Sequence, residues 1–478
     1  MITSQRMAAV DRNAEALGVP RKQLMESSGN AVARAVRRSA DPGARVAVVA
    51  GRGNNGGDAL VAARFLDDYD VAVHLLGRPE TIATGIAREN WEALRDAEYD
   101  ARAVTDSADL DLGDPDVVVD AMLGTGVTGA LREPEATAAS AINDADATVV
   151  AVDVPSGVDA DTGEAAGVAV DADRVVTFHD EKPGLDAVDA AVTVADIGIP
   201  EAAELFTGPG DLLALGRPDR SHKGDFGEVL VVGGGPYTGA PALAAQAALR
   251  AGADLVRVAC PASVAREIQG YSESLILRPY DGDHLTPAHV GELLTLASAH
   301  DVTVLGPGLG SDEETLAAVR DFLDAYEETA VVDADALEVV PTVDTDATLL
   351  CTPHQGELRK MGGETDEDWR TRADLVADFA ADLGHVLLVK GAYDVIADGG
   401  DRRVNRTGNP GMTVGGTGDV LAGAAGALAC VLPPFEAAAV AAYANGCAGD
   451  AAVEENGYGL VATDLIDRLP AALWGDDE

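Results

Sequence analysis

The sequence predicts an α/β protein with two domains, each built around a parallel sheet. Three observations lead to this prediction. The chain has 478 residues, the length of two or three ordinary domains. Short apolar, β-branched segments alternate with helical patterns along the whole chain, as in βαβ units. Many of these segments are apolar on both faces, as strands are when helices cover both sides of a sheet.

The expected strands fall into two series. The first comprises Arg45–Ala50, Asp116–Ala121, Thr148–Val152, Arg174–Phe178 and Ala191–Ala195. The second comprises Glu228–Val232, Leu255–Ala259, Val302–Leu305, Thr329–Val332, Ala347–Cys351 and His385–Val389. Residues 208–222 between them are rich in glycine, proline and charge, so we place one domain at residues 1–212 and the other at 213–478. An apolar run at Val420–Pro433 is too short to cross a bilayer and predicts a buried helix.

The charge of the chain argues against several kinds of partner. It has 81 acidic and 34 basic residues, a formal net charge of −47. Such a surface repels phosphates, so we expect neither a nucleic acid nor a membrane as partner. The acids are scattered, which is typical of a solvated surface in a halophilic protein.

The four cysteines Cys260, Cys351, Cys430 and Cys447 lack C-x-x-C spacing and no signal peptide is recognised, so we expect free thiols in a cytoplasmic protein. The oligomeric state stays open, a homo-oligomer included.

A glycine-rich turn, GRGNNGGD, follows the first expected strand. Its central residues are Asn54, Asn55, Gly56, Gly57 and Asp58. Such a turn presents N–H groups at a helix N-terminus, which favours phosphate. The segment is neither a G-x-G-x-x-G fingerprint nor a Walker loop. A tight turn capped by Asp58 is therefore the alternative.

Aspartates also lie at the carboxyl ends of two further strands of the first series: Asp120 ends the run DVVVD, and Asp153 ends the run TVVAVD. In open α/β sheets ligands bind outside the carboxyl ends of the strands, so both carboxylates can converge on one pocket. The side chains of Asn55, Asp120 and Ser156 offer hard oxygen ligands, which suit an alkali or alkaline-earth cation. Capping of loops by the two aspartates is the alternative.

In the second domain, three glycines precede the apolar run. Gly415, Gly416 and Gly418 lie directly before the expected helix, with Asp419 in its first turn. The N–H groups at the positive end of a helix form an anion hole, and the adjacent carboxylate suits a general base for phosphoryl transfer. An N-cap in which Asp419 only caps the helix is the alternative. His354 follows a strand end, so we expect it to contact a ligand rather than to be a surface histidine.

The N-terminal half resembles the NAD(P)H-hydrate epimerases. The motifs LMESSG, GRGNNGGD, DAMLGTGVTG, AVDVPSGVDADTG, TFHDEKPGL and ADIGIP occur in the order of that family. The resemblance implies a Rossmann-like three-layer αβα domain in which Asp153 is catalytic and lies beside the nicotinamide ring. It implies K⁺ at Asn55, Asp120 and Ser156, and it gives Lys182 no clear role. The implied contacts to the phosphates and ribose are Asn54, Asn55, Gly56, Gly57, Asp58, Gly124, Thr125, Gly126, Val127, Thr128, Gly129 and Ala130.

The C-terminal half resembles the ADP- or ATP-dependent NAD(P)H-hydrate dehydratases. GGTGD before a helix occurs throughout the ribokinase-like fold, but HKGDFG, YTGAP, GPGLG, TPHQGE and NPGMTVGGTGD in this order are more specific. The resemblance implies a ribokinase-like αβα domain with Asp419 as the catalytic base, acting on NADHX or NADPHX with Mg²⁺ and ADP or ATP. The implied contacts are Ala240, Gly308, His354 and Asp419 for the hydrate, and Lys390, Gly391, Ala392, Tyr393, Asp394 and Gly418 for the nucleotide.

Two residues depart from the family pattern. Asp394 and Val414 stand where threonine is common, which puts the nucleotide contacts in doubt; a carboxylate at 394 needs a cation or an altered pose. The alternatives to a repair enzyme are a non-catalytic N-terminal binding module and a C-terminal small-molecule kinase. The sequence does not decide between ADP and ATP or between NADHX and NADPHX.

Overall fold

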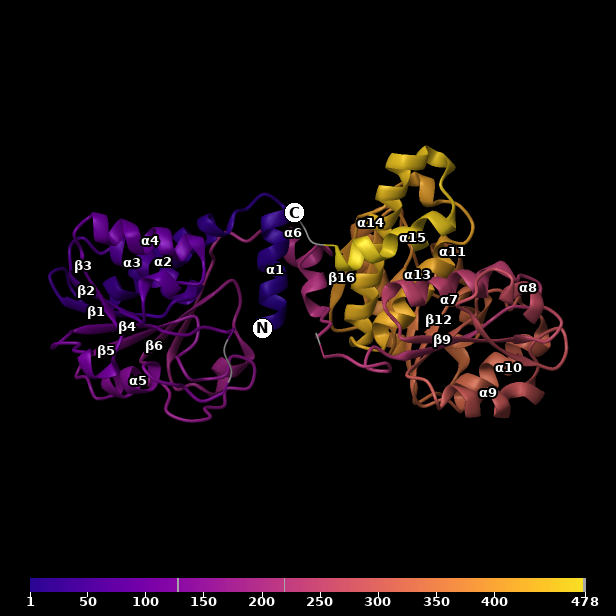
Figure 1. The fold of residues 1–478 in the computed structure, drawn as a ribbon, viewed down its shortest axis with the longest axis horizontal. Coiled ribbons are helices and arrows are strands. Elements are labelled where there is room, and N and C mark those ends of the chain that lie inside the picture. The colour runs from indigo at the N-terminus through magenta and orange to yellow at the C-terminus, as the bar shows by residue number, and fades with distance from the viewer. Residues whose placement is uncertain (127–128, 219, 476–478) are drawn as a thin grey trace. The chain divides into compact units, whose positions relative to one another are not determined.

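The computed structural model describes residues 1–126, 129–218 and 220–475. The chain divides into two compact units, the first comprising Met1–Ala203 and the second beginning at Glu204 (Figure 1). This contact boundary precedes the sequence-based boundary at residue 212. The reason is local: Leu205 and Phe206 pack against the core of the second unit, and the Thr207 amide donates to the Val404 carbonyl oxygen over 3.0 Å.

The first unit contains a seven-stranded sheet with the order β3-β2-β1-β4-β5-β6-β7 and parallel pairing between its neighbouring strands. The strands are β1 (Arg45–Ala50), β2 (Asp70–Leu76), β3 (Asp100–Val104), β4 (Val117–Ala121), β5 (Thr148–Val152), β6 (Arg174–Phe178) and β7 (Ala191–Ala195). Strand addition reverses direction between β1 and β4. That switch point is where α/β sheets bind ligands, at the carboxyl ends of the strands.

Helices cover both faces of this sheet. They are α1 (Ser4–Ala16), α2 (Arg21–Ser39), α3 (Asn54–Arg64), α4 (Gly85–Asp96), α5 (Glu135–Asn143) and the short α6 (Glu201–Leu205) at the boundary. Apolar residues of α1 to α4 form one core with the sheet, and α5 contributes to a second core on the opposite face. Figure 1 shows α2, α3 and α4 on one side of the strands and α5 on the other.

The second unit contains a nine-stranded sheet with the order β10-β9-β8-β11-β12-β13-β14-β15-β16. The strands are β8 (Glu228–Val232), β9 (Leu255–Pro261), β10 (Ile276–Tyr280), β11 (Val302–Leu305), β12 (Thr329–Val332), β13 (Thr348–Cys351), β14 (Val386–Val389), β15 (Asp394–Ala397) and β16 (Arg402–Asn405). Pairing is parallel from β10 to β14, and β14, β15 and β16 are antiparallel. The switch point of this sheet lies between β8 and β11.

The second sheet is also covered on both faces. Its helices are α7 (Gly239–Ala251), α8 (Ala265–Gln269), α9 (Val290–Ala297), α10 (Glu313–Asp324), α11 (Gln355–Lys360), α12 (Trp369–Leu383), α13 (Thr417–Ala429), α14 (Pro434–Asn456) and α15 (Ala462–Trp474). The helices α7, α13, α14 and α15 form one core, whereas α9, α10 and α12 pack on the other face. Alanine and glycine let α13 approach closely: a Cβ atom on Gly423 would lie 2.0 Å from the Ala244 carbonyl oxygen of α7.

The prediction of two α/β domains with parallel sheets is confirmed. Each predicted strand is present with small shifts at some ends, and the predicted buried helix is α13. The four cysteines are free, with Cys260 and Cys351 buried. In the part of the chain that the structure describes, no helix has both the length and the apolar character needed to cross a membrane.

Candidate active sites

The first candidate site lies at the carboxyl edge of the first sheet, at the switch point between β1 and β4. Glycine is required in the turn after β1 because two backbone segments touch there. A Cβ atom on Gly51 would lie 1.8 Å from the Met122 carbonyl oxygen, and one on Gly56 would lie 2.1 Å from the Gly51 oxygen. The helix α3 begins directly after this turn, at Asn54. The free N–H groups of its first turn are therefore available to an anionic ligand at this edge.

Oxygen atoms gather around the Leu123 backbone at the same edge. Asp120 is fully buried, and its carboxylate accepts hydrogen bonds from the Ser156 amide (2.8 Å), the Ser156 hydroxyl (2.7 Å) and the Met122 amide (3.3 Å). The Asn55 amide nitrogen donates to the Leu123 carbonyl oxygen over 2.9 Å, and the Ser156 hydroxyl lies 3.3 Å from that oxygen. Burial raises the pKa of Asp120 to about 6. The structure thus brings the three residues expected to bind K⁺ together.

Asp153 directly follows β5 and has a left-handed backbone conformation, with φ of +67°, which aspartate tolerates better than most residues. Its Oδ1 atom accepts a hydrogen bond from the Thr177 hydroxyl (3.0 Å) and forms an ion pair with Lys182 Nζ (3.1 Å). Lys182 is fully buried, and its Nζ also donates to the carbonyl oxygens of Phe178 (2.8 Å) and Asp180 (3.1 Å). An ammonium has three N–H groups, and three acceptors surround this one. Lys182, which the sequence left without a role, therefore holds the Asp153 carboxylate.

Two further carboxyl groups interact electrostatically with Asp153. Asp58 in α3 is buried, and this burial, with the nearby charges of Asp153 and Asp11, raises its pKa well above the usual range. Burial also raises the pKa of Asp11 in α1 to about 6, and Asp153 acts in the same direction, whereas Arg21 opposes the shift. Sequence reasoning missed Asp11, which lies in a helix without a motif.

The segment expected to contact phosphate and ribose, residues 124–130, follows β4. Val127 and Thr128 lie outside the described residues. A Cβ atom on Gly124 would lie 3.2 Å from Asn55 side-chain atoms, so this segment begins against the oxygen cluster. A small pocket beneath it is lined by Leu123, Gly124 and Gly129 on one side and by residues 154 and 155 and 157–159 on the other.

The second candidate site lies at the N-terminus of α13. Gly416 is the N-cap residue with φ of +98°, a conformation that favours glycine, and α13 begins at Thr417. Gly418 lies against a lysine: a Cβ atom there would be 3.3 Å from Lys390 Nζ. Asp419 occupies the first turn, as predicted. The free amides of the helix, the ammonium and the carboxylate are therefore gathered at one end of α13.

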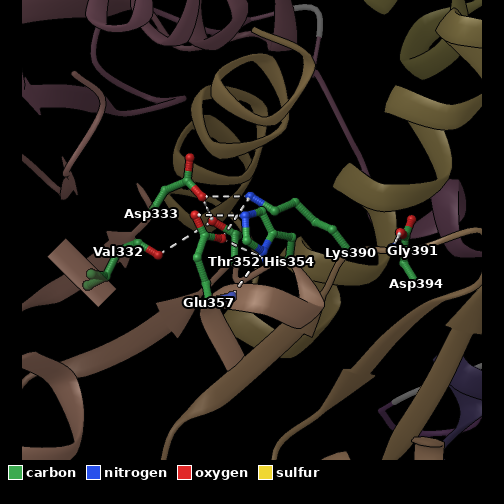
Figure 2. Close-up of polar contacts among 8 residues, drawn as sticks. All are labelled: Val332, Asp333, Thr352, His354, Glu357, Lys390, Gly391 and Asp394. Carbon is green, nitrogen blue, oxygen red and sulfur yellow. Dashed lines mark hydrogen bonds and ion pairs between the residues drawn. The ribbon is translucent and has the colours of Figure 1, made fainter. Parts of the chain in front are cut away.

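Lys390 is held by carboxylates that follow neighbouring strands. Its Nζ lies 2.9 Å from Asp333 Oδ1 and 3.9 Å from Glu357 Oε2. Asp333 directly follows β12 and is buried, and its Oδ1 atom also accepts a hydrogen bond from the Thr352 hydroxyl over 2.8 Å. Figure 2 shows these side chains converging on one point. Sequence reasoning did not select Asp333, although its position directly after a strand is the kind of signal that identified Asp153.

The electrostatics of this cluster favour a base that is active near neutral pH. Burial raises the pKa of Asp419 to about 7; the carboxylates of Asp333 and Glu357 act in the same direction, and Lys390 opposes them. Burial disfavours the charge of Lys390, but Asp333, Glu357 and Asp419 outweigh it and raise its pKa. A carboxyl group with such a pKa can both accept and release a proton at physiological pH.

His354 lies beside this cluster and caps a helix. Its Nδ1 atom accepts a hydrogen bond from the Glu357 amide (2.9 Å), and its own amide donates to Glu357 Oε2 (2.8 Å), which forms a capping box at the start of α11. The side chain is 60% exposed. The other ring nitrogen, Nε2, is 3.5 Å from Glu357 Oε1. The cap thus fixes the orientation of the His354 ring, and most of the side chain stays exposed to a ligand.

The carboxylate of Asp394 is not directed at the Lys390 cluster. It accepts hydrogen bonds from the Gly391 amide (2.8 Å) and the Asn405 side chain (2.9 Å), and burial raises its pKa to about 6. Figure 2 shows Asp394 and Gly391 on the far side of the Lys390 backbone from Asp333. Whether a carboxylate at position 394 is accommodated by a cation or by an altered pose stays a prediction. Nothing in the structure explains the replacement at Val414.

The remaining expected hydrate contacts lie at the switch point of the second sheet. Ala240 is in the first turn of α7, which follows β8, and Gly308 follows β11. Gly308 has φ of +75°, and a Cβ atom on it would lie 2.3 Å from the Tyr237 carbonyl oxygen. The two loops that carry Ala240 and Gly308 are therefore in direct contact.

Comparisons with known proteins agree with this division. Residues 21–184 match the family described as YjeF-related protein N-terminus, and residues 229–471 match the family described as NAD(P)H-hydrate dehydratase. Two relatives are described as bifunctional NAD(P)H-hydrate repair enzymes Nnr. The one from Methanothermobacter thermautotrophicus is 45% identical and covers 98% of this chain and 94% of its own length. The one from Pyrobaculum aerophilum is 46% identical and covers 99% and 98%.

Solved structures resemble the second unit. The ADP/ATP-dependent NAD(P)H-hydrate dehydratase of Bacillus subtilis, co-crystallised with ATP and Mg²⁺, is 27% identical with a TM-score of 0.49 and covers 56% of this chain and 97% of its own. A ribokinase-like superfamily protein of Enterococcus faecalis is 25% identical with a TM-score of 0.49 and covers 55% and 93%. The family matches and the full-length relatives place the chain: it belongs to the family of bifunctional NAD(P)H-hydrate repair enzymes.

Proposed function

We propose that the chain repairs hydrated nicotinamide cofactors, with one reaction in each unit. The first unit interconverts the R and S epimers of NADHX and NADPHX. The second dehydrates the S form to NAD(P)H and converts ADP to AMP, or ATP to ADP, with release of phosphate. The observation that carries the proposal is the position of Asp419 in the first turn of α13, beside the ion pair of Lys390 and Asp333. Family membership and the order of the motifs support it.

The dehydration must convert a poor leaving group into a better one, because hydroxide leaves carbon poorly. In the proposed step, Asp419 takes the proton of the C6 hydroxyl, and the hydroxyl oxygen attacks the terminal phosphorus of the nucleotide. The bond from that phosphorus to the bridging oxygen then breaks. The N–H groups at the start of α13 and the Lys390 ammonium stabilise the charge on the transferring group. Phosphate then leaves C6 with the bonding electrons, and loss of the C5 proton gives NAD(P)H.

The nucleotide contacts are proposed at Lys390 through Asp394 and at Gly418, and the hydrate contacts at Ala240, Gly308, His354 and Asp419. Mg²⁺ bound with the nucleotide would supply positive charge at its phosphates. The carboxylates of Asp333 and Glu357 fit a hard cation of this kind, and both lie within 4 Å of Lys390 Nζ.

The proposed epimerisation requires a carboxylate that can face a positively charged ring. Loss of the C6 hydroxyl from the hydrate leaves a cation, and water can return to either face. Asp153 is proposed to stabilise this cation and to transfer the proton, while Lys182 keeps the carboxylate oriented. The Asp120 carboxylate, the Ser156 hydroxyl and the Leu123 carbonyl oxygen, to which the Asn55 side-chain nitrogen donates, support K⁺ as the bound ion.

The proposal is tested by incubating the purified chain with NADHX or NADPHX and with ADP, ATP or no nucleotide. Reduced-nicotinamide absorbance should recover only with a nucleotide, and AMP or ADP should form in equal amount. The competing assignment, a small-molecule kinase, predicts a stable phosphorylated product and no recovery. Recovery without a nucleotide would contradict the proposed coupling.

We also propose that the protein is halophilic and cytoplasmic. The net charge of −47 means that acidic side chains repel one another in dilute buffer. In 1 M salt the Debye length falls to roughly 3 Å, so this repulsion is screened. The melting temperature should therefore be higher in molar KCl than in dilute buffer. NaCl is the control, because K⁺ also has a proposed site in the first unit. A melting temperature that is unchanged or lower in both salts would contradict the halophilic assignment. The four free cysteines support a reducing compartment.

A further inference from the structure

The switch point of the second sheet carries a pocket of about 420 Å³, which is within the size range of small-molecule sites. We name it the switch-point pocket. Its lining includes Gly235 and Pro236 after β8, Ser263 after β9, Asp283 after β10, and Leu309 and Asp312 after β11. The pocket therefore lies where the strand order reverses, at the carboxyl ends of the strands. This is the position at which open α/β sheets bind their ligands.

The switch-point pocket lies next to the proposed hydrate site. Pro236, which lines the pocket, precedes α7 and its Ala240, and Leu309, which also lines it, directly follows Gly308. The strands β12 and β13, whose ends carry Asp333 and His354, are the next neighbours of β11. At the usual spacing of strands, the pocket and the reacting end of the site are roughly 10 Å apart. An extended dinucleotide can bridge that distance, with its pyrophosphate near the N-terminus of α7.

The charge on the pocket wall differs from that of the phosphoryl-transfer site. The wall carries the carboxylates of Asp283 and Asp312, and none of its described residues is lysine or arginine. His284 also lines it, and its ring lies 2.7 Å from an Asp283 oxygen and 3.2 Å from a Glu314 oxygen. A protonated His284 balances one of the three carboxylates of Asp283, Asp312 and Glu314, so this wall keeps a net negative charge. The phosphoryl-transfer site, in contrast, retains Lys390. The pocket wall is therefore suited to hydroxyl groups and unsuited to a phosphate.

We propose that the switch-point pocket binds the adenosine half of the hydrate and that Asp283 and Asp312 make the second unit prefer NADHX to NADPHX. A carboxylate accepts hydrogen bonds from a ribose 2′-hydroxyl, whereas it repels the 2′-phosphate of NADPHX. This inference rests on the proposed dehydratase activity of the same unit. It names Asp283 and Asp312 as residues that determine specificity.

The test compares kcat/KM for S-NADHX and S-NADPHX with a saturating nucleotide in dilute buffer. Wild-type protein should favour NADHX by about tenfold or more, and the double variant Asp283→Asn/Asp312→Asn should reduce the ratio to below about threefold, mainly by lowering KM for NADPHX. Asparagine preserves the shape of both residues and is as good an N-cap as Asp312 is for α10. Asp321→Asn, an exposed change on the same helix, removes one charge away from the pocket and should leave the ratio unchanged.

Three outcomes would overturn the inference: equal use of both hydrates, a preference for NADPHX, or a ratio that the double variant leaves as Asp321→Asn does. Absence of any dehydration would instead contradict the proposed function. In that case the dissociation constants of NADH and NADPH are measured instead. The quantity compared is the change in their ratio between the wild-type protein and the double variant. Ring and carboxylate atoms of His284, Asp312 and Glu314 lie within 4.8 Å of one another, so a divalent cation there would mask the repulsion. The binding is therefore measured in EDTA, and the kinetic assay is run with Mg²⁺ no higher than the nucleotide concentration.

Discussion

Asp419→Asn should slow nucleotide-dependent dehydration by about 100-fold to 10,000-fold, the contribution expected of a general base. The amide has nearly the shape of the carboxylate but cannot take the proton of the C6 hydroxyl. Epimerisation should continue at the wild-type rate, because Asp419 belongs to the second unit. Dehydration is followed by reduced-nicotinamide absorbance, and epimerisation by separating the R and S forms chromatographically. A variant that keeps more than about a tenth of wild-type dehydration would remove Asp419 from the role of base.

The same assignment gives the wild-type enzyme a defined pH dependence. Burial raises the pKa of Asp419 to about 7, so the active carboxylate form is lost as the pH falls below that value. Because kcat/KM reports the groups of the free enzyme, kcat/KM for dehydration should decline about tenfold per pH unit on the acid side of pH 7. In Asp419→Asn the remaining activity should lack this acid limb.

The melting temperature of Asp419→Asn shows whether the variant loses activity because it unfolds, since the substitution should raise stability while it lowers activity. The pKa of Asp419 is raised on folding, so its ionisation makes the folded state less favourable as the pH rises from the unfolded value of 3.8 to about 7. Asparagine removes that cost. At about pH 8 the variant should therefore melt at or above the wild-type temperature. Asp321→Asn provides an exposed aspartate change that should alter neither activity nor melting.

Most strands that the sequence predicts lie inside a sheet, and most of those it misses lie at an edge. Predicted strands such as β1, β4 and β11 lie inside a sheet and are buried on both faces, so nearly every residue is apolar. Three of the missed strands, β3, β10 and β16, lie at sheet edges, whereas the missed strands β2 and β15 lie inside a sheet. In β3, DARAV, only Ala101 and Val104 are buried, and the charged residues face solvent. A pattern of this kind cannot be distinguished from a polar loop without its neighbours.

The candidate sites divide in a similar way. Residues in glycine-rich segments or directly after apolar strands could be identified from the sequence, because backbone geometry and topology fix their positions. Asp419 and Asp153 are of this kind. Asp11 and the contacts of Lys182 and Asp394 depend on how separate segments pack. The pose of Asp394 requires Asn405 from the next strand, and no local pattern predicts that pairing.

Asp153→Asn should make the repair of a racemic hydrate biphasic. The S half should be converted at nearly the wild-type rate, and the R half only as fast as it epimerises spontaneously. The reason is geometric, since phosphoryl transfer requires the C6 hydroxyl to align with Asp419 and the nucleotide. Asparagine is preferable to alanine here, because residue 153 has φ of +67° and a change to alanine would add backbone strain to the loss of the carboxylate. The time course of absorbance recovery with excess nucleotide shows the two phases.

Lys182 supplies the internal control for this prediction. If Lys182 acts by holding the Asp153 carboxylate, Lys182→Met should slow epimerisation in wild-type protein but add little to Asp153→Asn. A purely structural role predicts additive losses together with a lower melting temperature in both backgrounds. Both variants should keep the wild-type rate on pure S hydrate, because the second unit is unchanged.

The result that decides the role of the first unit is the slow phase. Asp153 lies at the end of β5 with its carboxylate held by Thr177 and Lys182, a geometry suited to facing a cationic ring. If Asp153→Asn converts a racemic hydrate completely in a single phase at the wild-type rate, Asp153 does not act in the mechanism. The R form must then be inverted elsewhere in the chain or accepted directly at Asp419. Assaying the variant on pure R hydrate without a nucleotide separates these two cases, because only inversion yields the S form under that condition.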